Sequence, residues 1–184
     1  MTKPDKIHIG KSKFHRRGLI ASSDIEKGER MFLIKGKKIK FLINNKRQAD
    51  KAGLNWIGYD KNTWIDPVGY GLFINHSCAP NSGIRKRLEV VALRNIKKGE
   101  EVTFDYSFSE ADIFWRIKCN CKHRLCRKTI RSVQFLPRAV FRKNLPSIPK
   151  YFRAVFKKFH ASDFKNTAEL REKWLDFITK GFRL

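Results

Sequence analysis

This sequence is short of cysteine, of acidic residues and of long apolar runs. Only 4 of its 184 residues are cysteine, and 17 are aspartate or glutamate against 41 lysines and arginines. Met31-Phe-Leu-Ile34 is among the longest apolar runs, whereas a membrane-spanning helix needs roughly 20 residues. The segment from Met1 to Lys6 lacks the apolar core of a secretory signal, so only export without an N-terminal signal stays open. We therefore expect an intracellular protein with no membrane span.

The excess of positive charge amounts to +24 and is uneven along the chain. Between Ile113 and Ser162 there is no aspartate or glutamate, while lysine and arginine occur fourteen times. Such a segment favours contact with phosphates of a polyanion, and no motif of the sequence-specific DNA-binding classes is present. We expect the chain to be cytoplasmic or associated with a nucleoid or chromatin. This basic C-terminal region is predicted to bind DNA or another polyanion nonspecifically, with a solvated basic face as the alternative.

The four cysteines are spaced as ligands of one metal ion. Cys119, Cys121 and Cys126 form a C-x-C-x4-C cluster, and Cys78 lies well upstream. Four thiolates complete the tetrahedral shell of a structural Zn²⁺, so His123, inside the cluster, is expected at the surface. Free thiols are the alternative, or disulfides if the protein is secreted. We predict one structural zinc ion held by the four cysteines.

The chain upstream of the cysteine cluster has the pattern of short strands separated by turns. Gly28 and Gly99 each close a charged turn of similar sequence, Asp24-Ile-Glu-Lys-Gly28 and Asn95-Ile-Lys-Lys-Gly99, where a positive φ is expected. Residues 44–62 are polar and fit a short helix. The runs with the composition or alternation of strands are residues 6–9, 18–21, 30–34, 38–43, 63–66 and 88–93.

Two amphipathic helices are expected after the cysteine cluster. The first covers residues 151–159, and the second follows the capping arrangement Asn166-Thr-Ala-Glu169, with Gly181 as its stop. A basic amphipathic helix also suits a membrane surface or a partner, but packing on the domain is the interpretation we adopt. The expected apolar faces are Phe152, Val155, Phe156 and Phe159 for the first helix, and Leu170, Trp174, Phe177 and Ile178 for the second.

Two further motifs complete the pattern. Asn75-His76-Ser77-Cys78-Ala79-Pro80-Asn81 contains the upstream cysteine, and Gly99-Glu-Glu-Val-Thr-Phe-Asp105-Tyr106 lies between it and the cluster. In this order, the two motifs and the cluster resemble the SET-domain protein-lysine methyltransferases with a C-terminal post-SET zinc module. The resemblance covers roughly residues 6–127.

The resemblance implies a mainly β fold with small helices, in which several small sheets surround a pseudoknot. The pseudoknot places the Asn75-His76 segment beside the Gly99–Tyr106 segment. A helical appendage would follow at the C-terminus. On this basis residues 1–117 form the SET domain, 118–128 the post-SET zinc-binding segment and 129–184 a basic helical C-terminal extension.

The same resemblance implies that S-adenosylmethionine is the co-substrate. His15-Arg-Arg-Gly-Leu-Ile-Ala21 resembles the first cofactor segment of the family, whose usual form is Gly-x-Gly, and Arg16 stands at the first of those glycines. The Asn75-His76 segment is the second cofactor segment, and its cysteine is the fourth zinc ligand. The implied cofactor-binding residues are Arg16, Arg17, Gly18, Leu19, Asn75, His76 and Tyr106.

Tyr106 and Phe104 are the candidate catalytic residues. A lysine ammonium must lose its proton before it attacks a methyl group, and a tyrosine hydroxyl can then orient the neutral amine. Phe104 resembles the family's Phe/Tyr product-specificity position, where a phenyl ring leaves room for repeated methylation. Ordinary packing is the alternative for both rings, and Asp105 is expected to hold the backbone.

We therefore predict a protein-lysine N-methyltransferase that favours di- and trimethylation of a protein substrate, with chromatin- or DNA-associated proteins among the candidate substrates. The alternative is a catalytically weak SET scaffold that acts as a basic module for binding nucleic acid or protein. Intact Asn75, His76 and Tyr106 favour the enzyme, whereas Arg16 is the argument for the scaffold.

Overall fold

The structure, a computed structural model, describes residues 6–53, 55–85 and 88–180. The chain divides into two compact units, and each unit is assembled from three separate segments. Unit 1 comprises Met1–Gly36, Pro67–Asp105 and Lys118–Lys128. Unit 2 comprises Lys37–Asp66, Tyr106–Ile117 and Thr129–Leu184.

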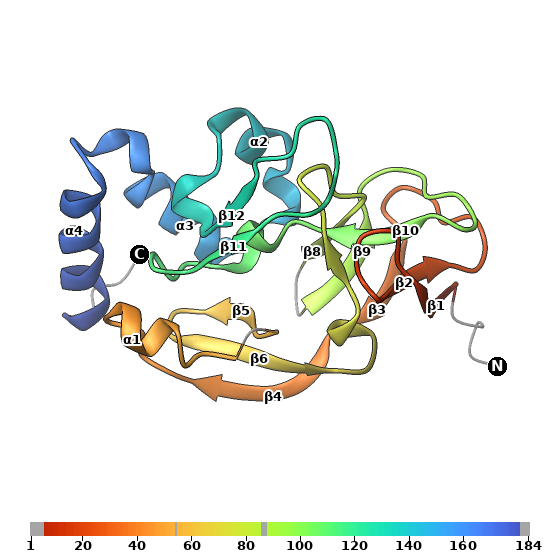
Figure 1. Cartoon of the computed structure of the whole chain (residues 1–184), viewed down its shortest axis with the longest axis horizontal. Coiled ribbons are helices and arrows are strands. Elements are labelled where there is room, and N and C mark those ends of the chain that lie inside the picture. The colour runs from red at the N-terminus through yellow and green to blue at the C-terminus, as the bar shows by residue number, and fades with distance from the viewer. Residues whose placement is uncertain (1–5, 54, 86–87, 181–184) are drawn as a thin grey trace. The chain divides into compact units, whose positions relative to one another are not determined.

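A four-stranded sheet in unit 1 carries most of the predicted site. Its order is β1-β2-β10-β7, with β10 antiparallel to β2 and parallel to β7. In the parallel pair, Thr103 lies opposite Asn75 and Phe104 opposite His76. The two motifs are therefore side by side, as the pseudoknot requires. The strands span Ile7–Lys11 (β1), Arg17–Ala21 (β2), Asn75–His76 (β7) and Glu101–Phe104 (β10), and β1, β2 and β10 are adjacent in Figure 1.

The second sheet of unit 1 has three antiparallel strands in the order β3-β9-β8. Val90, Val91 and Ala92 on the central strand are buried, as the apolar run of the sequence predicts. The 3-10 helix η1 (Gly69–Leu72) precedes β7. The strands of this sheet are β3 (Arg30–Leu33), β8 (Ser82–Arg85) and β9 (Glu89–Ala92).

The two similar turns pack against each other in a nearly symmetrical way. Both glycines have the expected positive φ, 86° at Gly28 and 85° at Gly99, and Ile25 forms a β-bridge with Ile96. The first side chain of each turn accepts a 2.9 Å hydrogen bond from a backbone N–H of the other turn. These bonds run from Lys98 to Asp24 and from Lys27 to Asn95.

A third sheet, in the order β4-β6-β5, belongs mainly to unit 2. Its edge strand β4 spans Lys35–Lys40, so the expected strand at 38–43 was wrong by about three residues. The apolar residues after Lys40 leave the sheet, and Phe41 packs edge-on against Trp56 at 5.9 Å. Lysines suit an edge strand because they discourage pairing with another chain. The other elements are α1 (Lys46–Ala49), β5 (Ile57–Asp60) and β6 (Thr63–Val68).

The remaining elements of unit 2 are short apart from two helices. The pair β11 (Arg116–Lys118) and β12 (Thr129–Arg131) flanks the cysteine cluster in sequence. The expected helices are present as α3 (Lys150–Phe159) and α4 (Thr167–Thr179), with all eight predicted apolar side chains buried. The others are η3 (Tyr106–Ser109), η4 (Val133–Phe135), α2 (Arg138–Lys143), η5 (Leu145–Ser147) and η6 (Ala161–Asp163).

The start of α4 is fixed by the predicted cap. The Asn166 side chain accepts from the Glu169 backbone N–H at 3.0 Å, and the Glu169 carboxylate accepts from Lys165 N at 2.8 Å. Gly181, the predicted stop, lies outside the described residues. Within the described ranges, no helix combines the length and apolarity that a membrane span needs.

Candidate functional site

The N-terminal strands and β7 meet at Gly18. The Asn75 side-chain amide donates to the Arg17 carbonyl at 2.8 Å and to the Glu101 carboxylate at 2.7 Å. A Cβ at Gly18 would lie 2.3 Å from Glu101 Oε1 and 2.9 Å from Asn75 Nδ2. Glycine is therefore required at this position because any side chain would displace both groups.

Glu101 also holds the loop that precedes β2. Ser12 Oγ lies 2.9 Å from each carboxylate oxygen of Glu101, and the backbone N–H of Lys13 donates to the same carboxylate at 3.3 Å. Ser12 Oγ in turn accepts from the backbone N–H groups of Phe14 and His15, both at 3.0 Å. Sequence reasoning missed Glu101 and Ser12 as site residues, although Glu101 lies in the quoted Gly-Glu-Glu motif.

The two predicted cofactor-binding arginines are exposed. Arg16 and Arg17 extend from the segment that leads into β2, and the Arg17 guanidinium lies 4.5 Å from the centre of the Phe73 ring. Leu19 is fully buried beneath them and pairs with Val102 of β10. The segment thus offers two cations at the surface and an apolar anchor in the core.

Asn81, the last residue of the Asn75–Asn81 motif, fixes the path of β10. Its side chain donates to the Glu101 carbonyl and accepts from the Thr103 N–H, both at 2.8 Å. Ser82 Oγ donates to the Thr103 carbonyl at 2.9 Å. Asn81 is 3% exposed, so these bonds are shielded from water and hold the strand that leads to Phe104.

The end of β10 is buried against the His76 segment. Phe104 is 1% exposed, and its carbonyl accepts from the Ser77 N–H at 3.0 Å. Asp105 is completely buried and forms an ion pair with Arg127 at 2.6 Å. Its carboxylate is 3.6 Å from His76 Nδ1. Burial, followed by the charge of Arg127, lowers the pKa of His76 to about 3, so the imidazole is neutral at physiological pH.

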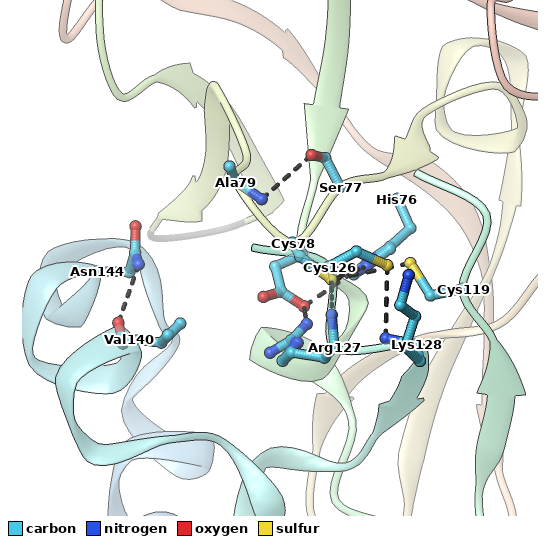
Figure 2. Close-up of polar contacts among 11 residues, drawn as sticks. His76, Ser77, Cys78, Ala79, Cys119, Cys126, Arg127, Lys128, Val140 and Asn144 are labelled. Atoms are coloured by element: carbon cyan, nitrogen blue, oxygen red, sulfur yellow. Dashed lines mark hydrogen bonds and ion pairs between the residues drawn. The ribbon is translucent and has the colours of Figure 1, made fainter. Parts of the chain in front are cut away.

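The cysteines gather around this ion pair. His76, Cys78, Cys119 and Cys121 are all buried, and their ligand atoms lie within 4.8 Å of one another. Cys78 Sγ is 3.7 Å from Cys119 Sγ, and the Cys126 thiol contacts Cys119 and Cys121. Figure 2 shows His76, Cys78, Cys119 and Cys126 converging next to Arg127. Three of the four predicted zinc ligands thus lie in one buried cluster with His76, and the fourth, the half-buried Cys126, contacts two of them.

The donor set fits a thiophilic divalent cation. Three sulfur atoms and one neutral imidazole lie close together, and the Cys126 sulfur contacts two of those thiols; thiolate and imidazole are the ligand types of structural zinc sites. Burial raises the pKa of Cys119 and Cys78. Burial also opposes ionisation of Cys121, but backbone donors and the neighbouring thiols lower its pKa to about 7. A bound cation would favour the thiolate form of each ligand.

Two other sulfur contacts join the cluster to the ion pair. The backbone N–H of Arg127 donates to Cys78 Sγ at 3.4 Å, and His76 Nε2 lies 3.3 Å from the same sulfur. Asp105, His76 and Arg127 therefore connect the predicted metal ligands directly to the end of β10.

Tyr106 opens η3 and is the first residue of the segment that belongs to unit 2. It is half-buried, and it follows Asp105 directly in the chain. After η3 the chain buries two carboxyl groups, Glu110 and Asp112. Burial, and then the charge of Asp112, raises the pKa of Glu110 to about 8, although the Trp64 indole and two backbone N–H groups donate to it. Sequence reasoning did not single out this acidic pair.

Comparison with known proteins identifies the architecture. The family model described as SET domain matches residues 16–107, which is half of the chain. The chain belongs to the SET-domain family. The match contains residues 16–21 of the first predicted cofactor segment, the whole Asn75–Asn81 motif and Tyr106.

Curated relatives of the SET chain carry histone-lysine methyltransferase names. It is 35% identical over 141 residues to histone-lysine N-methyltransferase trithorax of Drosophila virilis, and 31% identical over 141 residues to histone-lysine N-methyltransferase 2B of Homo sapiens. Each match covers 69% of this chain. The chain spans only 4% and 5% of the length of these two relatives.

Solved structures support the SET fold. Two structures of KRYPTONITE cover 67% of this chain, with TM-scores of 0.52 and 0.53 and sequence identities of 21% and 20%. The chain covers 28% and 29% of those proteins. The predicted fold class, small sheets around a threaded crossing with C-terminal helices, is confirmed.

Proposed function

We propose that this SET domain transfers methyl groups from S-adenosylmethionine to a lysine side-chain amine of a protein, and that it favours di- and trimethylation. The observation that carries the proposal is the parallel pairing of β7 with β10. It sets Asn75 and His76 beside the strand that leads into Phe104 and Tyr106. The names of the curated relatives support the reaction class, and a histone or another chromatin protein is the substrate class they suggest.

The residues around Gly18 fit the proposed co-substrate. S-adenosylmethionine has a carboxylate, an amine and an adenine ring, and it supplies an electrophilic methyl group on a sulfonium cation. The exposed guanidinium groups of Arg16 and Arg17 suit the carboxylate, and the absence of a Cβ at Gly18 lets the strand backbone come close to its neighbours. The proposed binding residues are Arg16, Arg17, Gly18, Leu19, Asn75, His76 and Tyr106.

The chemistry required of Tyr106 is orientation of a neutral amine. A lysine in water has a pKa near 10.4 and is protonated, but an apolar channel disfavours the ammonium form. The hydroxyl of Tyr106, a half-buried residue, then directs the amine lone pair toward the methyl group, which is catalysis by positioning. Phe104, buried and without a hydroxyl, leaves space for an amine that already carries methyl groups.

We assign residues 118–128 to a zinc-binding segment between the SET domain, 1–117, and a basic C-terminal extension, 129–184. Its proposed ligands are Cys78, Cys119, Cys121 and Cys126, because the first three are buried close together and the half-buried Cys126 contacts Cys119 and Cys121. The ion pair between Arg127 and Asp105 would then connect the zinc-loaded segment to the end of β10.

The basic extension is proposed to contact DNA or another polyanion, which would deliver a chromatin- or nucleoid-bound substrate. Lys157 and Lys158 on α3 are exposed while the opposite face of that helix is buried. A catalytically weak scaffold is the second candidate function, and the observation in its favour is Arg16 at the position of the family's glycine.

The deciding experiment measures transfer of a labelled methyl group from S-adenosylmethionine into a panel of proteins, with mass spectrometry to locate the modified lysine. Tyr106→Phe should lower kcat by about 100-fold or more while leaving the affinity for S-adenosylhomocysteine unchanged. Tyr59→Phe, on β5 and outside the predicted site, is the matched control. Phe104→Tyr should shift the product toward monomethyl-lysine.

Two outcomes would overturn the assignment. A wild-type protein that binds S-adenosylhomocysteine but labels no protein would favour the scaffold. Full activity in the Tyr106→Phe variant would mean that another residue orients the amine.

A further inference from the structure

Glu101 joins three parts of the chain that are far apart in sequence. Its carboxylate receives hydrogen bonds from Ser12 and Lys13 in the loop before β2, and from Asn75 on β7. Its own strand, β10, pairs with β2, so the carboxylate lies directly over Gly18. One side chain therefore holds both proposed cofactor segments in a single arrangement.

The network leaves little freedom around Glu101. Ser12 is 7% exposed, and its hydroxyl is shared between the carboxylate and the N–H groups of Phe14 and His15. Bonds to an ionised carboxylate are stronger than bonds between neutral groups. The loop immediately before Arg16 is thus anchored by the Glu101 carboxylate on another strand, in addition to the hydrogen bonds within the loop.

We propose that Glu101 is a positioning residue for S-adenosylmethionine binding. It fixes the loop at residues 12–15 and the Asn75 amide so that Arg16, Arg17 and the backbone at Gly18 are arranged before the ligand arrives. The inference rests on the proposed function, because it concerns the same binding site. It adds a residue with no assigned part in that function.

The position of Gly18 supports this role. The carboxylate occupies the space that a Cβ at Gly18 would fill, at 2.3 Å, so the glycine and the glutamate depend on each other. Arg16 replaces the flexible first glycine of the usual family pattern. A loop with that substitution has fewer backbone conformations of its own, and a fixed anchor at Ser12 selects among them.

Pre-organisation of this kind affects binding more than the chemical step. Without the anchor, the loop becomes ordered only when the cofactor binds, and this ordering makes the binding free energy less favourable. In an enzyme saturated with cofactor the loop is already ordered, so the chemical step is unaffected. Loss of Glu101 should therefore raise the Kd and the KM for the cofactor and leave kcat at saturation nearly unchanged.

The experiment compares Glu101→Ala, Glu101→Gln and Ser12→Ala with Glu100→Ala in the full-length chain. Glu100 is the adjacent carboxylate, and it pairs with Arg94 instead of the loop, so it is the matched control. S-adenosylhomocysteine is titrated by calorimetry. Glu101→Ala should weaken its binding about tenfold or more, since two segments lose an ionised partner. The affinity of Glu101→Gln, which retains one hydrogen-bond acceptor, should lie between those of Glu101→Ala and the wild type.

Ser12→Ala tests whether the loop is the route of the effect. If Glu101 acts through Ser12, the double variant Ser12→Ala/Glu101→Ala should bind no more weakly than Glu101→Ala alone. Additive losses, or wild-type affinity in the folded Glu101→Ala variant, would overturn the proposal.

Hydrogen exchange of the ligand-free protein gives a readout that needs no methyl transfer. The amides of Phe14 and His15 should exchange faster than in the wild type in the Glu101→Ala and Ser12→Ala variants. In Glu100→Ala they should exchange at the wild-type rate. If wild type fails to bind S-adenosylhomocysteine, the proposed function is wrong. If wild type binds and these amides remain protected in Glu101→Ala, only the positioning role is wrong. Should Glu101→Ala not fold, Ser12→Ala and Glu101→Gln decide the same question.

Discussion

Asp105 is a fully buried carboxylate next to the proposed catalytic tyrosine, and it forms an ion pair with Arg127 at 2.6 Å. A buried ion pair adds little stability compared with an apolar pair, but loss of one member leaves an uncompensated charge. Since Arg127 directly follows Cys126 in the chain, this charge balance depends on the position of the cysteine segment.

We expect Arg127→Ala to reduce the free energy of unfolding by about 3–5 kcal/mol, because Asp105 is then buried without its cation. Denaturant unfolding of zinc-loaded protein measures the change. Arg124→Ala, an exposed arginine of the same segment, should change stability by no more than about 0.5 kcal/mol. Equal effects of the two substitutions would show that the ion pair is not what holds the segment.

At the scale of elements, the segment after η3 contains a group whose charge opposes folding. Glu110 has a pKa raised to about 8 by burial and by Asp112, whose own pKa burial raises to about 6. The folded state therefore binds protons more tightly than the unfolded chain. The stability from Glu110 is fully present below its ordinary pKa of 4.5 and is lost as the pH rises through about 8.

We expect Glu110→Gln to flatten the decline of unfolding free energy between pH 5.5 and 8.5, because glutamine keeps an acceptor for the backbone N–H groups but does not ionise. The difference between wild type and variant at each pH isolates this group from proton effects at the thiols. Glu172→Gln, an exposed glutamate on α4, is the control. Parallel curves for wild type and Glu110→Gln would contradict the assignment.

The proposed zinc-binding segment, residues 118–128, is an element whose order we expect to depend on the bound metal. We expect one zinc ion per chain in purified protein, measured by elemental analysis. Cys119→Ser should abolish that stoichiometry and weaken binding of S-adenosylhomocysteine, because metal binding supplies folding free energy to the segment. A metal-free active protein, or a disulfide at Cys78, would refute the zinc site.

Much of this element structure was predictable, for identifiable reasons. The faces of α3 and α4 followed from helical periodicity, and the positive φ values at Gly28 and Gly99 followed from turn composition. Strand β4 was misplaced because Phe41 resembles a strand residue but packs on Trp56. Helix α2, which has only Phe141 buried, offered too little periodicity to find.

The candidate site was predictable only where residues formed a motif. Asn75, His76, Cys78 and the C-terminal cysteines were placed by resemblance, and the structure brings their segments together. Ser12 and Glu101 were missed because their contact spans 89 positions, and periodicity carries no information about such pairs. The proximity of His76 to Cys119 and Cys121, which lie far along the chain, was missed for the same reason.

At the scale of the whole molecule, the net charge of +24 predicts salt-sensitive binding to duplex DNA. If about 5 phosphates are neutralised, the slope of log affinity against log salt should be about −4 to −5, from release of counterions. Fluorescence anisotropy across salt concentrations and across unrelated duplexes measures both the slope and the expected weak sequence dependence.

Reversal of Arg153, Lys157 and Lys158 to Glu should make that slope shallower and leave methyl transfer to a free peptide intact. The control variant carries the same number of charge reversals at a different site, namely Lys35, Lys37 and Lys40 on β4, each changed to Glu. It has the same net charge, so a difference between the two variants reports where the DNA binds. Absence of DNA affinity at about 50 mM salt would favour an acidic protein surface as the partner.

The three-segment construction of unit 1 has a consequence for synthesis on the ribosome. Strand β2 is made early, but its partner β10 emerges only after the sequence of two other sheets, and the Cys119–Cys126 segment comes later still. Pairings so distant in sequence are slow to form. A nascent chain from which residues 101–104 have not yet emerged must therefore leave the β10 side of β2 unpaired and exposed to chaperones and proteases. The supply of metal at that late moment would then determine how many new chains close unit 1 and how many are degraded.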